Sequence, residues 1–297
     1  MNEPKYEIEG NPFTEPSQSS TSMEKAPSGS EADPKLLDAL EEPKEIRRIV
    51  QEAILLAGGA VAILLQVAEP GVGKGVDNYS NFSARPMDRL RTTMTYVYCM
   101  AFGSREEKEA VIELVHRAHA AVKGPGYDAD DPELQLWVAA TLYAVGTDIY
   151  QRVFGPMSEV TAEEIYREYA VLAVSLRVRP EMWPPSRRAF WEYWDHKIAT
   201  IEVTDNARSV AKDLLFNKKL PLYFRPLLPL VRISTAEMLT PHLREGFGLK
   251  SSKTRKKTYS VMLGLTKATY PGLPKVIRTY PMRYYLKDMR RRLRSMA

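Results

Sequence analysis

Hydrophobic and polar residues follow a helical period over most of the chain. Leu90, Met94, Val97 and Ala101 recur at intervals of four, three and four, which places them on one face of a helix. No segment shows the sustained alternation of a β-strand. The pattern therefore predicts an all-α fold.

A second helix follows this first one after Gly103. Ser104 and Glu107 have the spacing of a capping box, in which the hydroxyl and the carboxylate each accept a hydrogen bond from a backbone N–H of the first turn. The helix predicted to begin at Arg105 places His119 within an apolar stripe. That stripe consists of Val111, Leu114, Val115, Ala118 and Val122.

The two helices bring candidate chemistry together. If they pack antiparallel about the corner at Gly103, Arg89 lies opposite His119, because the two residues are nearly equally far from the corner along the chain. Thr93 lies one turn from Arg89 on the same face. The pattern predicts an inward histidine facing a cation and a hydroxyl. The alternatives are a core histidine bound to a backbone carbonyl and a surface arginine.

The remaining pattern predicts further helices and one long loop. Thr161 and Glu164 have capping-box spacing and predict a helix that continues to Leu176. The other helices are predicted over residues 43–68, 132–154, 187–201, 205–216, 233–243, 252–269 and 281–295. The pair Gly58 and Gly59 indicates close approach of another helix or of a flat ligand.

Residues 69–86 are rich in Gly, Pro, Asn and Ser and predict a loop. The GVGKG segment within them lacks the spacing of a phosphate-binding loop, and glycine follows Lys74 where that motif requires Ser or Thr. A nucleotide site is therefore not predicted.

Composition divides the chain into a tail and one domain. Residues 1–34 are poor in aliphatic side chains and predict a disordered tail, and residues 35–297 predict a single helical domain. The single cysteine, Cys99, excludes an intrachain disulfide and is interpreted as an inert buried thiol. The N-terminus lacks the pattern of a secretory signal. The longest uncharged apolar run, residues 53–65, is shorter than the roughly 20 residues that span a bilayer.

Charge is distributed unevenly. From Lys218 onward the chain has 19 basic and 3 acidic residues, whereas the part before it has 23 basic and 34 acidic residues. The basic C-terminal helices could pair with the acidic half of the fold or contact an anionic membrane surface. No nucleic-acid motif accompanies them, so nucleic acid is not an expected partner.

Several motifs agree in order with a known family. They are GGAVAILLQVAEPGVGKGV, RLRTTMTYVYCMAFGS, HRAHAAVKG and YDADDPELQLWVAATL, and the resemblance that they carry covers about residues 45 to 245. With these motifs the chain resembles the MpaB and rubber-oxygenase (latex-clearing protein) family. The resemblance implies an all-helical oxygenase domain that binds haem b through a proximal histidine.

The resemblance also implies roles for individual residues. His119 matches the axial iron ligand, and Arg89 and Thr93 match the distal Arg and Thr that face bound oxygen. Thr92 stands where members commonly have Lys or Arg, and Ala139 stands where many have histidine. His116 precedes His119 by one turn, but no third metal ligand accompanies this HxxH pair.

The expected function is a haem b-dependent oxygenase that uses dioxygen to cleave a carbon–carbon double bond of a hydrophobic, isoprenoid-like substrate. The alternatives are a non-catalytic haem or lipid binder of the same fold and a cofactor-free helical protein that docks on a membrane. The expected location is intracellular, in solution or peripheral to a membrane such as the endoplasmic reticulum.

Overall fold

The computed structural model describes residues 43–79, 86–216 and 225–296, with the backbone alone for residues 86–89 and 296. The predicted tail over residues 1–34 lies outside these ranges and stays a prediction. The N-terminal helices are α2 (Glu45–Val50), η1 (Ala53–Gly58), α3 (Gly59–Ala68), α4 (Pro70–Tyr79), α5 (Pro86–Phe102), α6 (Arg105–Ala120), α7 (Pro132–Phe154), α8 (Glu159–Tyr169) and α9 (Val171–Val174). The remaining helices are η2 (Pro180–Met182), α10 (Arg187–Thr200), α11 (Asp205–Leu215), η3 (Arg225–Leu227), α12 (Leu228–Met238), α13 (Pro241–Gly246), α14 (Lys253–Thr269), η4 (Tyr270–Gly272), α15 (Lys275–Arg278) and α16 (Tyr280–Met296).

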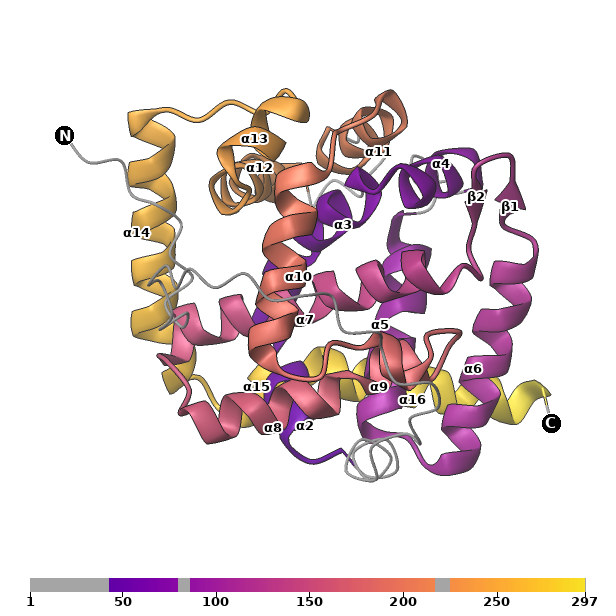
Figure 1. The fold of residues 1–297 in the computed structure, drawn as a ribbon. Helices are drawn as coiled ribbons and strands as arrows, with labels where there is room; N and C mark the ends of the chain where they lie inside the picture. Colours follow the sequence, from indigo (N-terminus) through magenta and orange to yellow (C-terminus); the bar gives the residue numbers. More distant parts are fainter. Residues whose placement is uncertain (1–42, 80–85, 217–224, 297) are drawn as a thin grey trace, which may run out of the picture.

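The prediction of an all-α fold is confirmed. In the described residues the strands are β1 (Lys123–Gly124) and β2 (Tyr127–Asp128), a two-stranded antiparallel pair between α6 and α7. Figure 1 shows the helices gathered around α7, which crosses the centre of the molecule. One hydrophobic core of buried residues extends from Ile46 of α2 to Met289 of α16.

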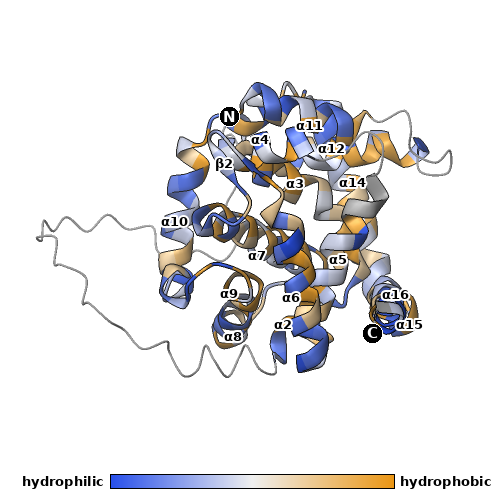
Figure 2. Ribbon diagram, turned by 90° about the vertical axis from the view of Figure 1, so that its right-hand side faces the viewer, coloured by the Kyte–Doolittle hydropathy of each residue, from blue (hydrophilic) through white to orange (hydrophobic). Residues whose placement is uncertain are grey.

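Helix α7 is central because its sequence is apolar on nearly all sides. Asp131 caps its N-terminus by accepting from the backbone N–H groups of Glu133 and Leu134, and Pro132 occupies the first turn. The Trp137 indole is fully buried and donates to the Leu65 carbonyl of α3 at 2.9 Å. Helices α2, α3, α9 and α14 all contact α7, and Figure 2 shows hydrophobic residues concentrated on α3 and α7.

The glycine pair at the start of α3 lets α7 approach closely. A methyl group at Gly58 would come within 2.1 Å of the Ile149 Cδ1 atom and 2.7 Å of the Val145 Cγ1 atom. Gly59 has open space around the same position. The close approach predicted from the sequence is therefore that of a helix, and it concerns Gly58 alone.

The loop predicted over residues 69–86 is wrong for residues 70–79, which form α4. A side chain at Gly71 would collide with Leu134, and one at Gly73 would meet the Val67 carbonyl at 2.4 Å. These glycines therefore permit close packing on α3 and α7 rather than turns. Lys74 donates to the Pro125 carbonyl and lies over the Tyr127 ring. Residues 80–85 lie outside the described ranges.

The helix predicted from Thr161 to Leu176 also differs. Ser158 is the N-cap, since its hydroxyl accepts from the backbone N–H of Thr161, and α8 ends at Tyr169 before the short helix α9. Ser and Thr both serve as N-caps, and the helix begins after the earlier residue, Ser158.

Among the described residues, no single helix is long and apolar enough to cross a membrane. Residues 53–68 and 70–79 meet the length and composition criteria only as a pair, with a 109° bend between them.

Candidate functional site

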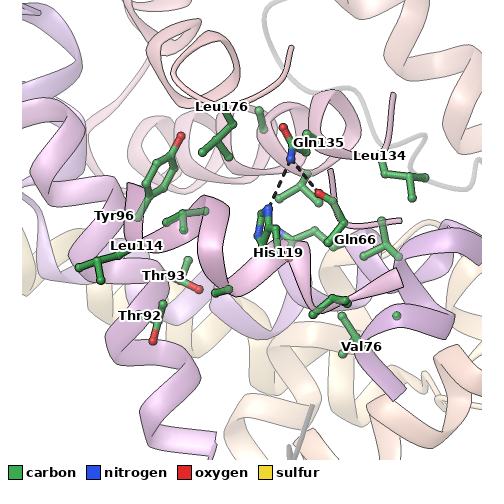
Figure 3. Close-up of a pocket in the computed structure, with 18 of the residues that line it drawn as sticks. Gln66, Val76, Thr92, Thr93, Tyr96, Leu114, His119, Leu134, Gln135 and Leu176 are labelled. Carbon is green, nitrogen blue, oxygen red and sulfur yellow. Dashed lines mark hydrogen bonds between the residues drawn. The ribbon is translucent and has the colours of Figure 1, made fainter. Parts of the chain in front are cut away.

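A cavity of about 540 Å³ lies between α4, α5, α6 and α7 (Figure 3). Its walls are mostly aliphatic, and its volume is typical of sites that bind small organic molecules, roughly 300–1,000 Å³. Besides three tyrosines, the polar side chains that line it are those of Gln66, Thr92, Thr93, Thr95, His119, Asp128, Gln135 and Arg292. The cavity is therefore suited to a largely apolar ligand held by a few polar groups.

The predicted helical pair forms one side of this cavity. Ser104 and Glu107 make both hydrogen bonds of the capping box, as the spacing predicted. Figure 1 shows α5 and α6 side by side, with the chain reversing direction between them. Thr93 of α5 and His119 of α6 both line the cavity, so the structure brings these two predicted site residues together. Arg89 lies in the first turns of α5, but its side chain is outside the described residues.

The apolar stripe of α6 lines the cavity, and Val111 within it also belongs to the core. Val111 is buried, but Leu114, Val115 and Val122 are only partly buried, and Ala118 is exposed. All of them line the cavity. Large apolar side chains along a cavity wall indicate that an apolar ligand covers them when it binds.

His119 projects from the last turn of α6 into this wall, with 31% of its side chain exposed. Its Nδ1 atom lies 3.4 Å from the Gln135 amide nitrogen and 4.0 Å from the Asp130 Oδ1 atom. Figure 3 shows the imidazole and the Gln135 amide facing each other. Both neighbours were missed by the sequence analysis. Gln135 could have been noticed as a polar residue within an apolar helix pattern, and it is buried here.

The orientation of the Gln135 amide is fixed by two hydrogen bonds. Its oxygen accepts from the backbone N–H of Arg177 at 2.7 Å, and its nitrogen donates to the Ala129 carbonyl at 2.7 Å. The amide can therefore offer His119 only its second N–H, which would bind a deprotonated Nδ1 atom. A protonated Nδ1 needs a different acceptor, and the Asp130 carboxylate is within reach.

Asp130 lies at the centre of three nitrogen-bearing groups. Its Oδ1 atom is 3.8 Å from His116 Nδ1, 4.0 Å from His119 Nδ1 and 3.8 Å from Arg177 Nε. In the described part of the chain, this oxygen and His116 Nδ1 are buried without a hydrogen-bond partner. Because a buried, unpaired carboxylate oxygen is costly, Asp130 is a ready acceptor for a small movement of the imidazole.

The side of the cavity on α5 bears hydroxyl groups. Thr92 and Thr93 both line it, and Thr95 accepts a hydrogen bond of 3.2 Å from the guanidinium of Arg292. Arg292 belongs to α16 and also pairs with Asp288 at 3.0 Å. The sequence analysis did not identify Arg292, because nothing in the local pattern relates α16 to α5. Arg292 brings a cation to the cavity lining.

The cysteine, the tryptophans and the histidines other than His119 do not line the cavity. In the described residues, no group of three or more His, Cys, Asp or Glu side chains is arranged to hold a metal ion. Burial raises the pKa of the Cys99 thiol to about 12, so it stays protonated at neutral pH. The His242 ring bonds the Ile201 carbonyl, and His196 is exposed. Trp194 stacks on Trp137 in the core.

Comparisons with known proteins identify the family of the chain. Residues 46–268 match the family model described as ER-bound oxygenase mpaB/B'/Rubber oxygenase, catalytic domain. Two relatives, each named only as an uncharacterized protein, come from Mycobacterium bovis and Mycobacterium tuberculosis. Each is 30% identical over 245 residues, which cover 79% of this chain and 96% of the relative. No solved structure matches the chain significantly.

Proposed function

The chain belongs to the ER-bound oxygenase mpaB/B'/rubber oxygenase catalytic-domain family, and we propose that it is a haem b-dependent oxygenase of a hydrophobic substrate. By the resemblance described above, the substrate class is isoprenoid-like and the reaction is oxidative cleavage of a carbon–carbon double bond. The residues proposed for the site are His119, Arg89 and Thr93.

One observation carries the proposal: His119 lies within an apolar helix stripe that faces a cavity of about 540 Å³. His242 instead bonds a backbone carbonyl, that of Ile201. A single protein histidine can hold haem iron. One histidine on an apolar cavity wall therefore suits haem. The described residues contain no cluster of three or more metal-binding side chains.

The second ring nitrogen of His119 also fits a haem ligand. Histidines that bind metals usually donate their other ring N–H to a carboxylate, a carbonyl or water, which fixes the tautomer. Asp130 supplies a buried carboxylate oxygen that lacks a hydrogen bond among the described residues. Donation from Nδ1 to Asp130 would leave the lone pair of Nε2 for iron. Haem, when bound, supplies the oxygen chemistry.

The chain's own residues have three tasks in this proposal. His119 holds the cofactor, and Asp130 orients the imidazole. By the family resemblance, the Thr93 hydroxyl and the Arg89 guanidinium would supply hydrogen-bond donors to the bound oxygen substrate. The aliphatic residues of α4, α6 and α7 bind the hydrocarbon chain of the substrate and exclude water from the cavity.

The test is a visible absorption spectrum of the purified protein, supplied with haemin, before and after reduction with dithionite. We expect a Soret band that changes on reduction, and a displaced or absent band in His119→Ala. His196→Ala is the matched control, since His196 is exposed and distant from the cavity lining. Absence of a Soret band in the wild-type protein, or an unchanged spectrum in His119→Ala, would refute the assignment.

A second candidate is a non-catalytic haem or lipid binder of the same fold. It is favoured by Thr92 and Ala139, two departures from the family pattern that both line the cavity. Oxygen consumption with a polyprenyl substrate distinguishes the candidates. Oxygen consumption by the wild type above that of His119→Ala supports the oxygenase. A haem spectrum that changes with the substrate, without oxygen consumption, supports the binder.

A further inference from the structure

A protruding apolar segment precedes the last helix. All residues from Pro271 to Ile277 are exposed. Three of them are large and apolar: Leu273 is 38% exposed, Val276 56% and Ile277 54%. Single exposed aliphatic residues are common, but three within five positions form a patch that the fold leaves uncovered. Seven exposed residues in succession make a protrusion rather than a groove.

The patch continues onto α16 with two tyrosines. Tyr280 is 61% exposed and Tyr284 is 54% exposed, and their rings stack with centroids 6.2 Å apart. They occupy one face of the helix because they are four positions apart. Tyrosine is enriched where proteins meet the boundary between lipid and water, since its ring is apolar and its hydroxyl is polar.

The surroundings of the patch are basic. From Pro271 to the end of the chain there are eight Lys and Arg residues and a single acidic residue, Asp288. Asp288 is itself paired with Arg291 and Arg292. Lys275 and Lys287 are exposed on either side of the tyrosines in the sequence. Apolar side chains within a basic surround are complementary to a bilayer that contains anionic lipid.

Figure 2 shows α15 and α16 at one edge of the molecule. We propose that Leu273, Val276, Ile277, Tyr280 and Tyr284 dock this edge on the surface of an anionic lipid bilayer. The shape favours lipid over a folded partner, because a protrusion can insert among headgroups without needing a complementary pocket.

Docking at this edge would also place the cavity near lipid. Met289 and Leu293 of α16 line the cavity, and Met289 lies only five residues, about 8 Å of helix, beyond Tyr284. A hydrophobic substrate dissolved in the bilayer would then be close to the cavity. The docking itself does not depend on the proposed haem chemistry, so either can fail without the other.

The test is co-sedimentation of the full-length protein with phosphatidylcholine vesicles that contain or lack phosphatidylserine. We expect binding to the anionic vesicles that weakens with salt. The variant Leu273→Ser/Val276→Ser/Ile277→Ser should lose most of this binding. Val160→Ser is the matched control, because Val160 is an apolar side chain that is 71% exposed on α8.

The charge contribution is tested with Lys275→Gln/Lys287→Gln. Removing each charge should weaken binding about fivefold at low salt, whereas the control Arg117→Gln/Lys212→Gln should bind as the wild type does. Equal binding of the serine variant and the wild type, or equal binding to neutral vesicles, would overturn the proposal. So would self-association that the serine variant abolishes without any vesicle binding, which would identify a second copy as the occupant.

Discussion

Replacing Asp130 with a residue that cannot accept a hydrogen bond should weaken haem binding. Asp130 Oδ1 is the carboxylate oxygen that lies 4.0 Å from His119 Nδ1. The Gln135 amide cannot replace it, since its oxygen is already bound to the backbone N–H of Arg177. Without Asp130, the tautomer of His119 that is proposed to bind iron through Nε2 loses its acceptor.

The size of the effect follows from this geometry. Loss of the hydrogen-bond partner of a metal-bound histidine typically costs about 10- to 100-fold in affinity. The imidazole must move by about 1 Å to make a charge-assisted hydrogen bond of roughly 2.8 Å to Asp130. The cost of this movement offsets part of the free energy gained from the hydrogen bond. Asp130→Asn keeps one side-chain oxygen, so we expect it to weaken haem binding about tenfold, or by about 1.4 kcal/mol. Asp130→Leu keeps no hydrogen-bond acceptor, so we expect it to weaken haem binding by about 100-fold.

The assay is titration of the haem-free protein with haemin, followed at the Soret band. Asp131→Asn is the matched control: it removes a charge one position away, and its amide oxygen can still cap α7. Circular dichroism checks that each variant is folded. If Asp130→Leu binds haemin as tightly as the wild type, or if Asp131→Asn is equally impaired, Asp130 does not orient His119.

Three further predictions concern the fold itself. Gly58→Ala should destabilise the protein by about 1–3 kcal/mol because the methyl group collides with α7, whereas Gly59→Ala should be neutral or stabilising; urea unfolding measures both, and equal effects would contradict the packing argument. The Cys99 thiol should resist Ellman's reagent at neutral pH until the protein is unfolded, because its pKa is raised to about 12 by burial; fast labelling of the folded protein would contradict this. The hydrogen bond from Arg290 lowers the pKa of Glu107, so this carboxylate stabilises the fold above its unfolded pKa of about 4.3 and less as the pH falls through its folded pKa. The difference in unfolding free energy between wild type and Glu107→Gln should therefore be larger at neutral pH than in strong acid.

The helical pattern was sufficient to predict the elements around the site. The capping box at Ser104 and Glu107 marked the start of α6, and the apolar pattern after Pro132 predicted α7 to Phe154. Both signals are local, because a cap and an amphipathic stripe depend only on residues within a few turns. The family resemblance, carried by several such motifs in order, is confirmed by the match over residues 46–268.

The sequence pattern gave a wrong prediction where one residue type, glycine, has two structural roles. The glycines of α4 look like turn residues, but Gly71 and Gly73 are small because Leu134 and the Val67 carbonyl approach them. A glycine that permits a turn and a glycine that permits close packing are identical in the pattern. Only the neighbouring helices decide between them.

By itself the sequence determined most of the helices, the helix face that carries His119 and the basic character of the C-terminal part. Tertiary structure decided what His119 faces. Asp130 and Gln135 converge on its Nδ1 side, and Arg292 reaches Thr95 from 197 positions away. The physical reason is that periodicity specifies which side of a helix turns inward, whereas the partners of a buried polar group depend on how distant segments pack.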